Sequence, residues 1–170
     1  MPRSFDMSTD YGGTVEQVHR AFGDEGYWLA RLANSGADEA ALESMRVGSD
    51  GSIDVVTVQV LRGDRLPALV TQLHRGDLRI RRDEKWGPVV DGVANATVLG
   101  SIPNLPVGLT GTGVLAPVGD SGGARLTFRA TVEVRVPLIG GRIENLIGSQ
   151  LVELLIAEQR FTTTWIAENA

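Results

Sequence analysis

Cysteine is absent from the 170-residue sequence, and aromatic residues make up only 5% of it. Without cysteine the chain forms no disulfide, no thiolate nucleophile and no thiolate metal site. No apolar run reaches the length of about 18 residues that a membrane-spanning helix needs, so we expect no stable membrane insertion. The N-terminal residues lack the apolar stretch of a signal peptide, and we expect a cytoplasmic protein.

Motifs for metal, cofactor or nucleic-acid chemistry are also missing. The two histidines, His19 and His74, are far apart in sequence and have no flanking ligand pattern, so we expect no metal and no cofactor. A Gly-x-Ser-x-Gly elbow is absent, which disfavours a serine hydrolase. The net charge of -5 gives no general attraction to phosphate backbones or anionic lipid. The arginines of residues 75–82 therefore indicate a solvated strand edge rather than a nucleic-acid site.

The apolar residues that are present predict one α+β domain over residues 1–170. A half-buried strand comes first, and two short helices follow it, the first after a capping box at Thr14 and Gln17. About six further strands follow, with a small helix inserted over 64–77, and a long amphipathic helix over 141–167 ends the chain. The expected strands cover 3–8, 41–47, 52–61, 78–86, 92–100, 108–118 and 124–136.

The last strand and the long helix predict how the core is closed. The strand over 124–136 alternates cleanly between apolar and polar residues, as in an antiparallel sheet with one solvated face. A helical wheel places six apolar residues of the helix within roughly 80° of one another, since successive residues turn by roughly 100°. These residues are Ile143, Ile147, Leu151, Leu154, Phe161 and Trp165. These patterns predict a curved sheet of about seven strands wrapped around this helix.

This order of elements resembles the START-like superfamily, also called the Bet v 1-like, polyketide-cyclase or SRPBCC fold. The turn from strand to helix in "VPLIGGRIE" (136–144) carries much of the likeness. More narrowly, "LRIRRDEKW" and "PLIGGRIENLIGSQL" resemble the actinobacterial family DUF2505. The resemblance implies a helix-grip fold with a hydrophobic cavity between the sheet and the helix, and it gives Pro137, Gly140 and Gly141 an architectural role. It supplies no catalytic residues.

A candidate site lies where polar residues interrupt the apolar face of the helix. Gln150 and Glu158 fall at the edges of that face. If Leu78 and Ile80 of the strand over 78–86 point inward, unbroken alternation turns Arg82, Glu84 and Trp86 inward too. We predict an Arg82–Glu158 pair inside the cavity or at its mouth; the alternative is that helix and strand diverge and both groups reach water. The predicted ligand-binding residues are Ile147, Gln150, Leu151, Leu154, Glu158, Phe161, Trp165, Arg82 and Trp86.

Three local features each allow two interpretations. Gly148, in the helix interior, indicates either tight packing or room for a ligand. The glycines of "GLTGTG" (108–113) suggest unfilled volume opposite the helix. The apolar loop within 100–109 is either a flap at a pocket mouth or a hairpin folded onto the rim.

The leading hypothesis is binding of a hydrophobic, lipid- or polyketide-like small molecule in the cavity, as a carrier or sensor. The alternative is a cyclase, dehydratase or hydrolase acting in the same cavity, with Glu158 as a general acid or base whose pKa is raised by burial. A third hypothesis is an interaction protein that uses its outer surface. The missing catalytic constellation favours binding; the ligand and the oligomeric state stay open.

Overall fold

A curved antiparallel sheet forms the framework of the molecule. A computed structural model describes residues 2–169, and over these residues seven strands pair in the order β1-β7-β6-β5-β4-β3-β2. The strands are β1 (Arg3–Tyr11), β2 (Glu39–Val47), β3 (Ile53–Leu61), β4 (Leu78–Trp86), β5 (Ala94–Ser101), β6 (Val107–Val118) and β7 (Gly123–Val134). The first strand therefore closes onto the last one, and β1 and β2 form the two edges.

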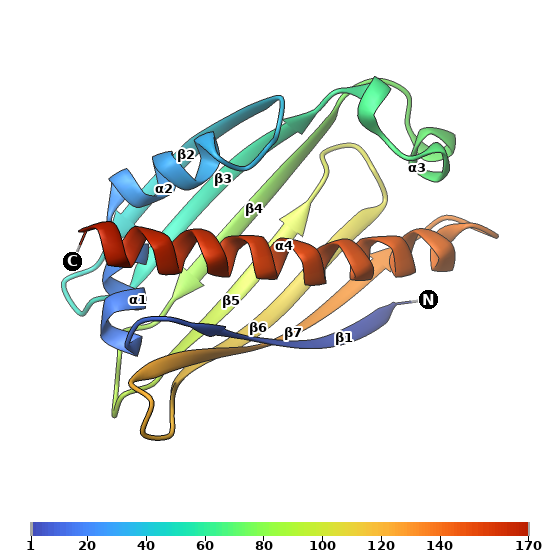
Figure 1. Cartoon of the computed structure of the whole chain (residues 1–170). Coiled ribbons are helices and arrows are strands. Elements are labelled where there is room, and N and C mark those ends of the chain that lie inside the picture. The colour runs from blue at the N-terminus through green and yellow to red at the C-terminus, as the bar shows by residue number, and fades with distance from the viewer. Residues whose placement is uncertain (1, 170) are drawn as a thin grey trace.

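Helices cover one face of this sheet (Figure 1). The long helix α4 (Gly140–Asn169) runs across that face, and α1 (Val15–Phe22) and α2 (Glu25–Ala33) lie near its C-terminal end. A short 3₁₀ turn, η1 (Gly63–Arg65), and the helix α3 (Ala68–Leu73) lie towards its N-terminal end. The predicted α+β order is confirmed, as is the capping box in which Thr14 and Gln17 exchange hydrogen bonds of 2.9 and 3.1 Å.

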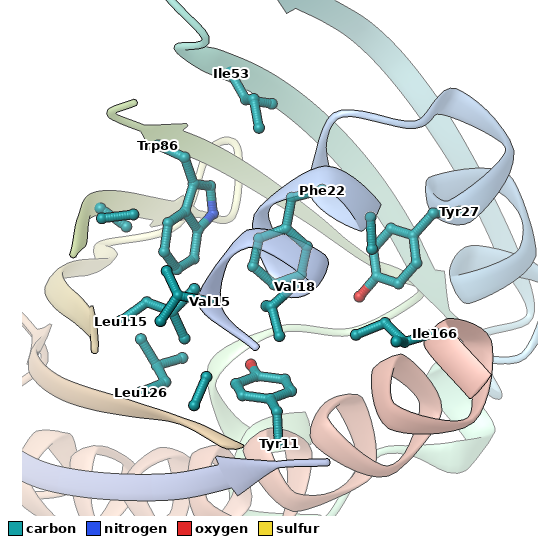
Figure 2. Close-up of a cluster of buried hydrophobic side chains, with 14 of the residues drawn as sticks. Tyr11, Val15, Val18, Phe22, Tyr27, Ile53, Trp86, Leu115, Leu126 and Ile166 are labelled. Atoms are coloured by element: carbon teal, nitrogen blue, oxygen red, sulfur yellow. The ribbon is translucent and has the colours of Figure 1, made fainter. Parts of the chain in front are cut away.

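Two apolar clusters fill the space under α4. Figure 2 shows the first, here called the aromatic core, in which Phe22 lies between Trp86 and Tyr27 and against Val18. The ring centroids of Phe22 and Trp86 are 4.9 Å apart, and Trp86 is only 4% exposed. The second apolar cluster is centred on Val132, Val134 and Ile143. Its partly buried members are Phe5, Leu69, Leu73, Val107, Leu109, Val136, Ile139, Ile147 and Leu151.

Phenylalanine rings occupy the space that the glycines suggested was free. A Cβ atom added to Gly148 would lie 2.3 Å from the Phe5 ring, so close packing of α4 on β1 explains this glycine. In β6, a Cβ atom on Gly111 would lie 2.2 Å from the Phe128 ring. The expectation of unfilled volume opposite the helix is therefore wrong at Gly111 and Gly113, because side chains from β7 cover these two glycines, whereas Gly108 has no atom near its Cβ position.

Candidate functional site

Four charged side chains meet between the two apolar clusters. Arg82 on β4 binds Glu158 on α4 through two parallel hydrogen bonds, Nη1 to Oε2 at 2.9 Å and Nη2 to Oε1 at 3.1 Å. Arg31 on α2 approaches the same Oε2 with its Nη2 at 2.5 Å. Arg82 Nε also donates to Glu84 Oε2 at 2.8 Å. The predicted Arg82–Glu158 pair is confirmed, within what we call the four-charge network of Arg31, Arg82, Glu84 and Glu158.

Local patterns in the sequence bring these residues together. In β4 the inward-facing residues alternate, so Arg82, Glu84 and Trp86 share one face, as predicted. Arg31 was not among the predicted site residues. It follows Tyr27 by one helical turn on the buried side of α2, together with Trp28 and Leu32. The pattern in the sequence that could have identified Arg31 is an arginine at this spacing on an otherwise apolar helix face.

The network is held in a low-exposure environment. The side chains of Glu84, Arg31, Arg82 and Glu158 are 8%, 10%, 19% and 20% exposed. Burial alone would raise the pKa of Glu158, but the charges and hydrogen bonds of Arg31 and Arg82 outweigh burial and lower it to about 2. The expectation that burial raises the pKa of Glu158 is therefore wrong, because two guanidinium groups surround the carboxylate.

A chain of neutral hydrogen bonds supports the network from the core side. Thr162 Oγ1 donates to the Glu158 carbonyl oxygen at 2.7 Å, which uses its one proton. Tyr27 must therefore donate its hydroxyl proton to Thr162 Oγ1, 2.6 Å away, and accept from Arg31 Nη1 at 3.2 Å. Burial raises the pKa of Tyr27, so this hydroxyl keeps its proton at neutral pH. The guanidinium of Arg31 also stacks 4.6 Å from the centre of the Trp28 ring.

A small pocket adjoins the network between α2, β3, β4 and α4. Its volume is about 80 Å³, below the roughly 300–1,000 Å³ of usual small-molecule pockets. We call it the α2–α4 pocket; it is lined by Trp28, Arg31, Leu32, Asn34, Ser35, Thr57, Gln59, Arg82, Leu154, Ala157, Glu158 and Phe161. Another hollow, of about 330 Å³, lies between α2 and the edge strand β2 and contains none of the predicted site residues.

The sequence is similar to that of proteins in one known family. A family model described as "Protein of unknown function (DUF2505)" matches residues 6–166. The chain belongs to the DUF2505 family. It is 58% identical over 173 residues to the uncharacterised protein Rv0481c of Mycobacterium tuberculosis, and the match covers 99% of each chain.

Solved structures show the fold of this DUF2505 protein. TTHA0849 from Thermus thermophilus matches with a TM-score of 0.63 at 16% identity, over 99% of this chain and all of the other. The Zhui aromatase/cyclase from Streptomyces sp. R1128 matches with a TM-score of 0.60 at 9% identity, over 98% and 94%. The chain therefore has the helix-grip fold of Bet v 1-like proteins, which the sequence resemblance implied.

The DUF2505 structure distributes the predicted site residues over several environments. Leu154, Glu158, Phe161 and Arg82 line the α2–α4 pocket. Ile147 and Leu151 belong instead to the second apolar cluster. Within residues 2–169 no group of three or more histidines and carboxylates is placed to hold a metal. No helix of that part of the chain has the length and apolar content to cross a membrane.

Three predicted site residues lie away from the pocket. Gln150 is exposed on α4, because the most deeply buried side of the helix faces β1 through Gly148. Trp86 is closed in the aromatic core beside Phe22. Trp165 packs against the Tyr27 ring, with centroids 5.8 Å apart. Their assignment to the pocket wall is corrected accordingly, because the wheel ranked residues by polarity alone and could not place the neighbouring elements.

Proposed function

We propose that this DUF2505 protein binds a small amphipathic molecule, as a carrier or sensor, with the molecule's polar end in the α2–α4 pocket. The apolar part would lie along the exposed edge of Leu154 towards Leu151 and Ile147. Leu154 is 38% exposed, and the other two are only partly buried. The pocket's volume of about 80 Å³ suits a polar end and not a whole lipid or polyketide.

The observation that carries this proposal is an excess of hydrogen-bond donors in the pocket wall. The two guanidinium groups of Arg31 and Arg82 have about ten N–H donors between them. They make five contacts of 3.2 Å or less to Glu158, Glu84 and Tyr27. Arg31 Nη2 also lies 4.0 Å from Glu84 Oε2, too far for a hydrogen bond. About half of the N–H groups therefore have no acceptor within residues 2–169, although every buried guanidinium nitrogen there has at least one partner. A ligand oxygen in the pocket would accept from these remaining N–H groups in place of water.

The charge of the network bears on the kind of polar end. Two guanidinium groups and two carboxylates have formal charges that cancel. A second anion beside Glu158 would be repelled by it, whereas a neutral carbonyl or hydroxyl oxygen accepts hydrogen bonds without adding charge. We therefore expect a neutral acceptor at the polar end, such as a ketone, ester or alcohol.

Binding is favoured over catalysis because of the state of Glu158. A general base works best with a pKa near the operating pH, and a carboxylate with a pKa of about 2 that is held by two arginines is a weak base. Solved structures with this fold include an aromatase/cyclase and a norcoclaurine synthase, so the same fold also supports enzymes. In this chain the residue expected to be the acid or base is committed to an ion-pair network.

Tryptophan fluorescence provides the test, because Trp28 lines the pocket beneath Arg31. Decanol, methyl decanoate and decanoate share an apolar chain and differ in their polar ends. We expect the alcohol and the ester to shift the fluorescence at lower concentration than the anion does. Ala157→Phe should block the pocket and remove the response, whereas Ala167→Phe, on an exposed part of the same helix, should leave it.

Two results would contradict the proposal. Tighter binding of decanoate than of decanol would show an anion site and not a neutral one. An equal response of the Ala157→Phe and Ala167→Phe variants would show that the apolar chains bind elsewhere on the surface. Mass spectrometry of small molecules extracted from the purified protein would then identify any ligand independently of this series.

A further inference from the structure

Leu138 has an unusual conformation at the corner between β7 and α4. Its side chain is 99% exposed, and its backbone φ is 71°, in the left-handed region that leucine rarely adopts. The N–H of Ile139 donates to the carbonyl oxygen of Pro137 at 2.8 Å, so Leu138 is the apex of a tight three-residue turn. Neither burial nor backbone preference explains a leucine here.

The corner that carries Leu138 is fixed by hydrogen bonds to the rest of the fold. Gly140 N–H donates to the Val136 carbonyl at 3.1 Å, and Arg135 N–H donates to the Pro106 carbonyl at 2.9 Å. Gly140 itself lies so close to the Val134 carbonyl that a Cβ atom would approach it to 2.5 Å. The exposed leucine is therefore held outward by the sheet and the helix start, and is not part of a loose loop.

Other partly exposed apolar residues lie at the same end of the molecule, near η1 and α3 in Figure 1. Leu69 and Leu73 of α3 pack on the second apolar cluster beside Val136 and Ile139. The loop 102–106 between β5 and β6 joins this end through the bond from Arg135 to Pro106, and its Ile102 and Leu105 are partly buried. We call residues 62–79, 102–106 and 133–142 together the α3 end.

The charge of the α3 end is opposite to that of the whole chain. Residues 62–79 and 133–142 contain six arginines and three acidic residues, whereas the complete chain has a net charge of -5. Within residues 2–169, Arg65 pairs with Asp38 and Arg135 pairs with Glu133. The other four arginines of the α3 end form no ion pair in that part of the chain and are exposed; they are Arg62, Arg75, Arg79 and Arg142.

We propose that the α3 end docks reversibly on an anionic lipid bilayer, with Leu138 inserted at the headgroup boundary. The exposed leucine and the free guanidinium groups of this end have no partner within residues 2–169. A bilayer surface provides an apolar layer at shallow depth for the leucine and phosphate groups for the guanidinium groups. One leucine and an excess of about three positive charges give weak, salt-sensitive attachment and not insertion, since each basic residue adds about 1 kcal/mol. Docking needs no bound ligand.

The position of the α3 end connects such docking with exchange of the proposed ligand. Leu69, Leu73 and Ile139 of this end pack against the second apolar cluster, which also includes Leu151 and Ile147. A ligand whose apolar part follows Leu151 and Ile147 would leave or enter there. If the proposed function holds, docking would then bring the apolar part of the binding region close to the bilayer, from which an amphipathic molecule is exchanged.

Co-sedimentation with vesicles tests the proposal on the full chain without added ligand. We expect binding to vesicles of phosphatidylglycerol mixed with phosphatidylcholine, no binding to phosphatidylcholine alone, and a decrease as salt rises. Arg142→Glu changes the local charge by two and should weaken binding roughly thirtyfold, from about 1 kcal/mol for each charge. Leu99→Asp is the matched control for Leu138→Asp, because Leu99 is 54% exposed on β5.

Leu138→Gly separates docking from folding. Glycine adopts positive φ without strain, so this variant should melt at a higher temperature than the wild type and yet lose vesicle binding. Equal loss of binding in the Leu99→Asp and Leu138→Asp variants would overturn the proposal. A wild-type chain that does not bind anionic vesicles would also overturn the proposal. In that case, loss of self-association by Leu138→Gly in analytical ultracentrifugation would show that a second copy covers this end.

Discussion

Replacing Glu158 with glutamine should destabilise the protein by about 3 kcal/mol at neutral pH. The pKa of this carboxyl is about 2 in the folded chain, compared with its ordinary value of 4.5. A tenfold change in an acid dissociation constant corresponds to about 1.4 kcal/mol, which gives the stated magnitude for the ionised form. The side chain is only 20% exposed, so solvent screens this interaction little. Breaking one partner out of a buried ion pair usually costs about 3–5 kcal/mol, which agrees.

The pH dependence of this loss has a defined sign. Because folding lowers the pKa of Glu158, its contribution is fully present above about pH 4.5. As the pH falls from 4.5 towards 2 the unfolded chain takes up the proton before the folded chain does, so the contribution decreases, and it is lost once the folded carboxylate is protonated as well. The difference in unfolding free energy between wild type and Glu158→Gln should therefore be constant near neutrality and shrink in acid.

Urea unfolding followed by tryptophan fluorescence measures this difference at several pH values. Glu153→Gln is the matched control, because Glu153 is exposed on the same helix and forms no ion pair within residues 2–169. We expect the control to change stability by less than about 0.5 kcal/mol at every pH. A Glu158→Gln variant as stable as the control at pH 7, or a difference that does not shrink in acid, would refute the account of the network.

Three further substitutions test contacts along α4, each by urea unfolding at neutral pH. Gly148→Ala should destabilise by about 1–3 kcal/mol through overpacking against Phe5, despite better helix propensity, and Phe5→Leu in the same chain should reverse the effect. Thr162→Val removes the donor to the Glu158 carbonyl and the acceptor for Tyr27, for a loss of about 1–3 kcal/mol. Glu144→Met leaves the Val134 N–H without its buried carboxylate acceptor, for a loss of about 1.5–3 kcal/mol. A change below about 0.5 kcal/mol in any of them would contradict its contact.

Periodicity predicted those parts of the site that one element determines by itself. In β4, strict alternation turned Arg82 and Glu84 to the same face as Trp86, and the wheel of α4 brought Glu158 towards them. Arg31 on α2 was missed because polar residues on an apolar helix face were considered only for the longest helix. Its spacing from Tyr27 on a buried helix face was present in the sequence.

Side chains from other elements decided what periodicity could not. The side of α4 that is most deeply buried is fixed by the contact of Gly148 with Phe5 on β1, which leaves Gln150 in solvent. In the same way, a glycine in β6 shows that a side chain is missing at its own position, but not that Phe128 of the next strand covers it. Pocket volume depends on such long-range filling, so the sequence overestimated the cavity.

Stability alone is a weak reason for four charges under a helix. Moving guanidinium and carboxylate groups out of water is costly, and well-packed apolar side chains at such positions are often as stable or more stable. The chain has apolar clusters on both sides of the network, with Trp86 and Phe161 on one side and Leu151 on the other, so an apolar continuation would be simple to build. The network instead leaves about half of its guanidinium donors without a protein acceptor next to a small pocket. These N–H groups at the pocket, more than the ion pairs, favour a binding role, because a ligand oxygen can replace water as their acceptor.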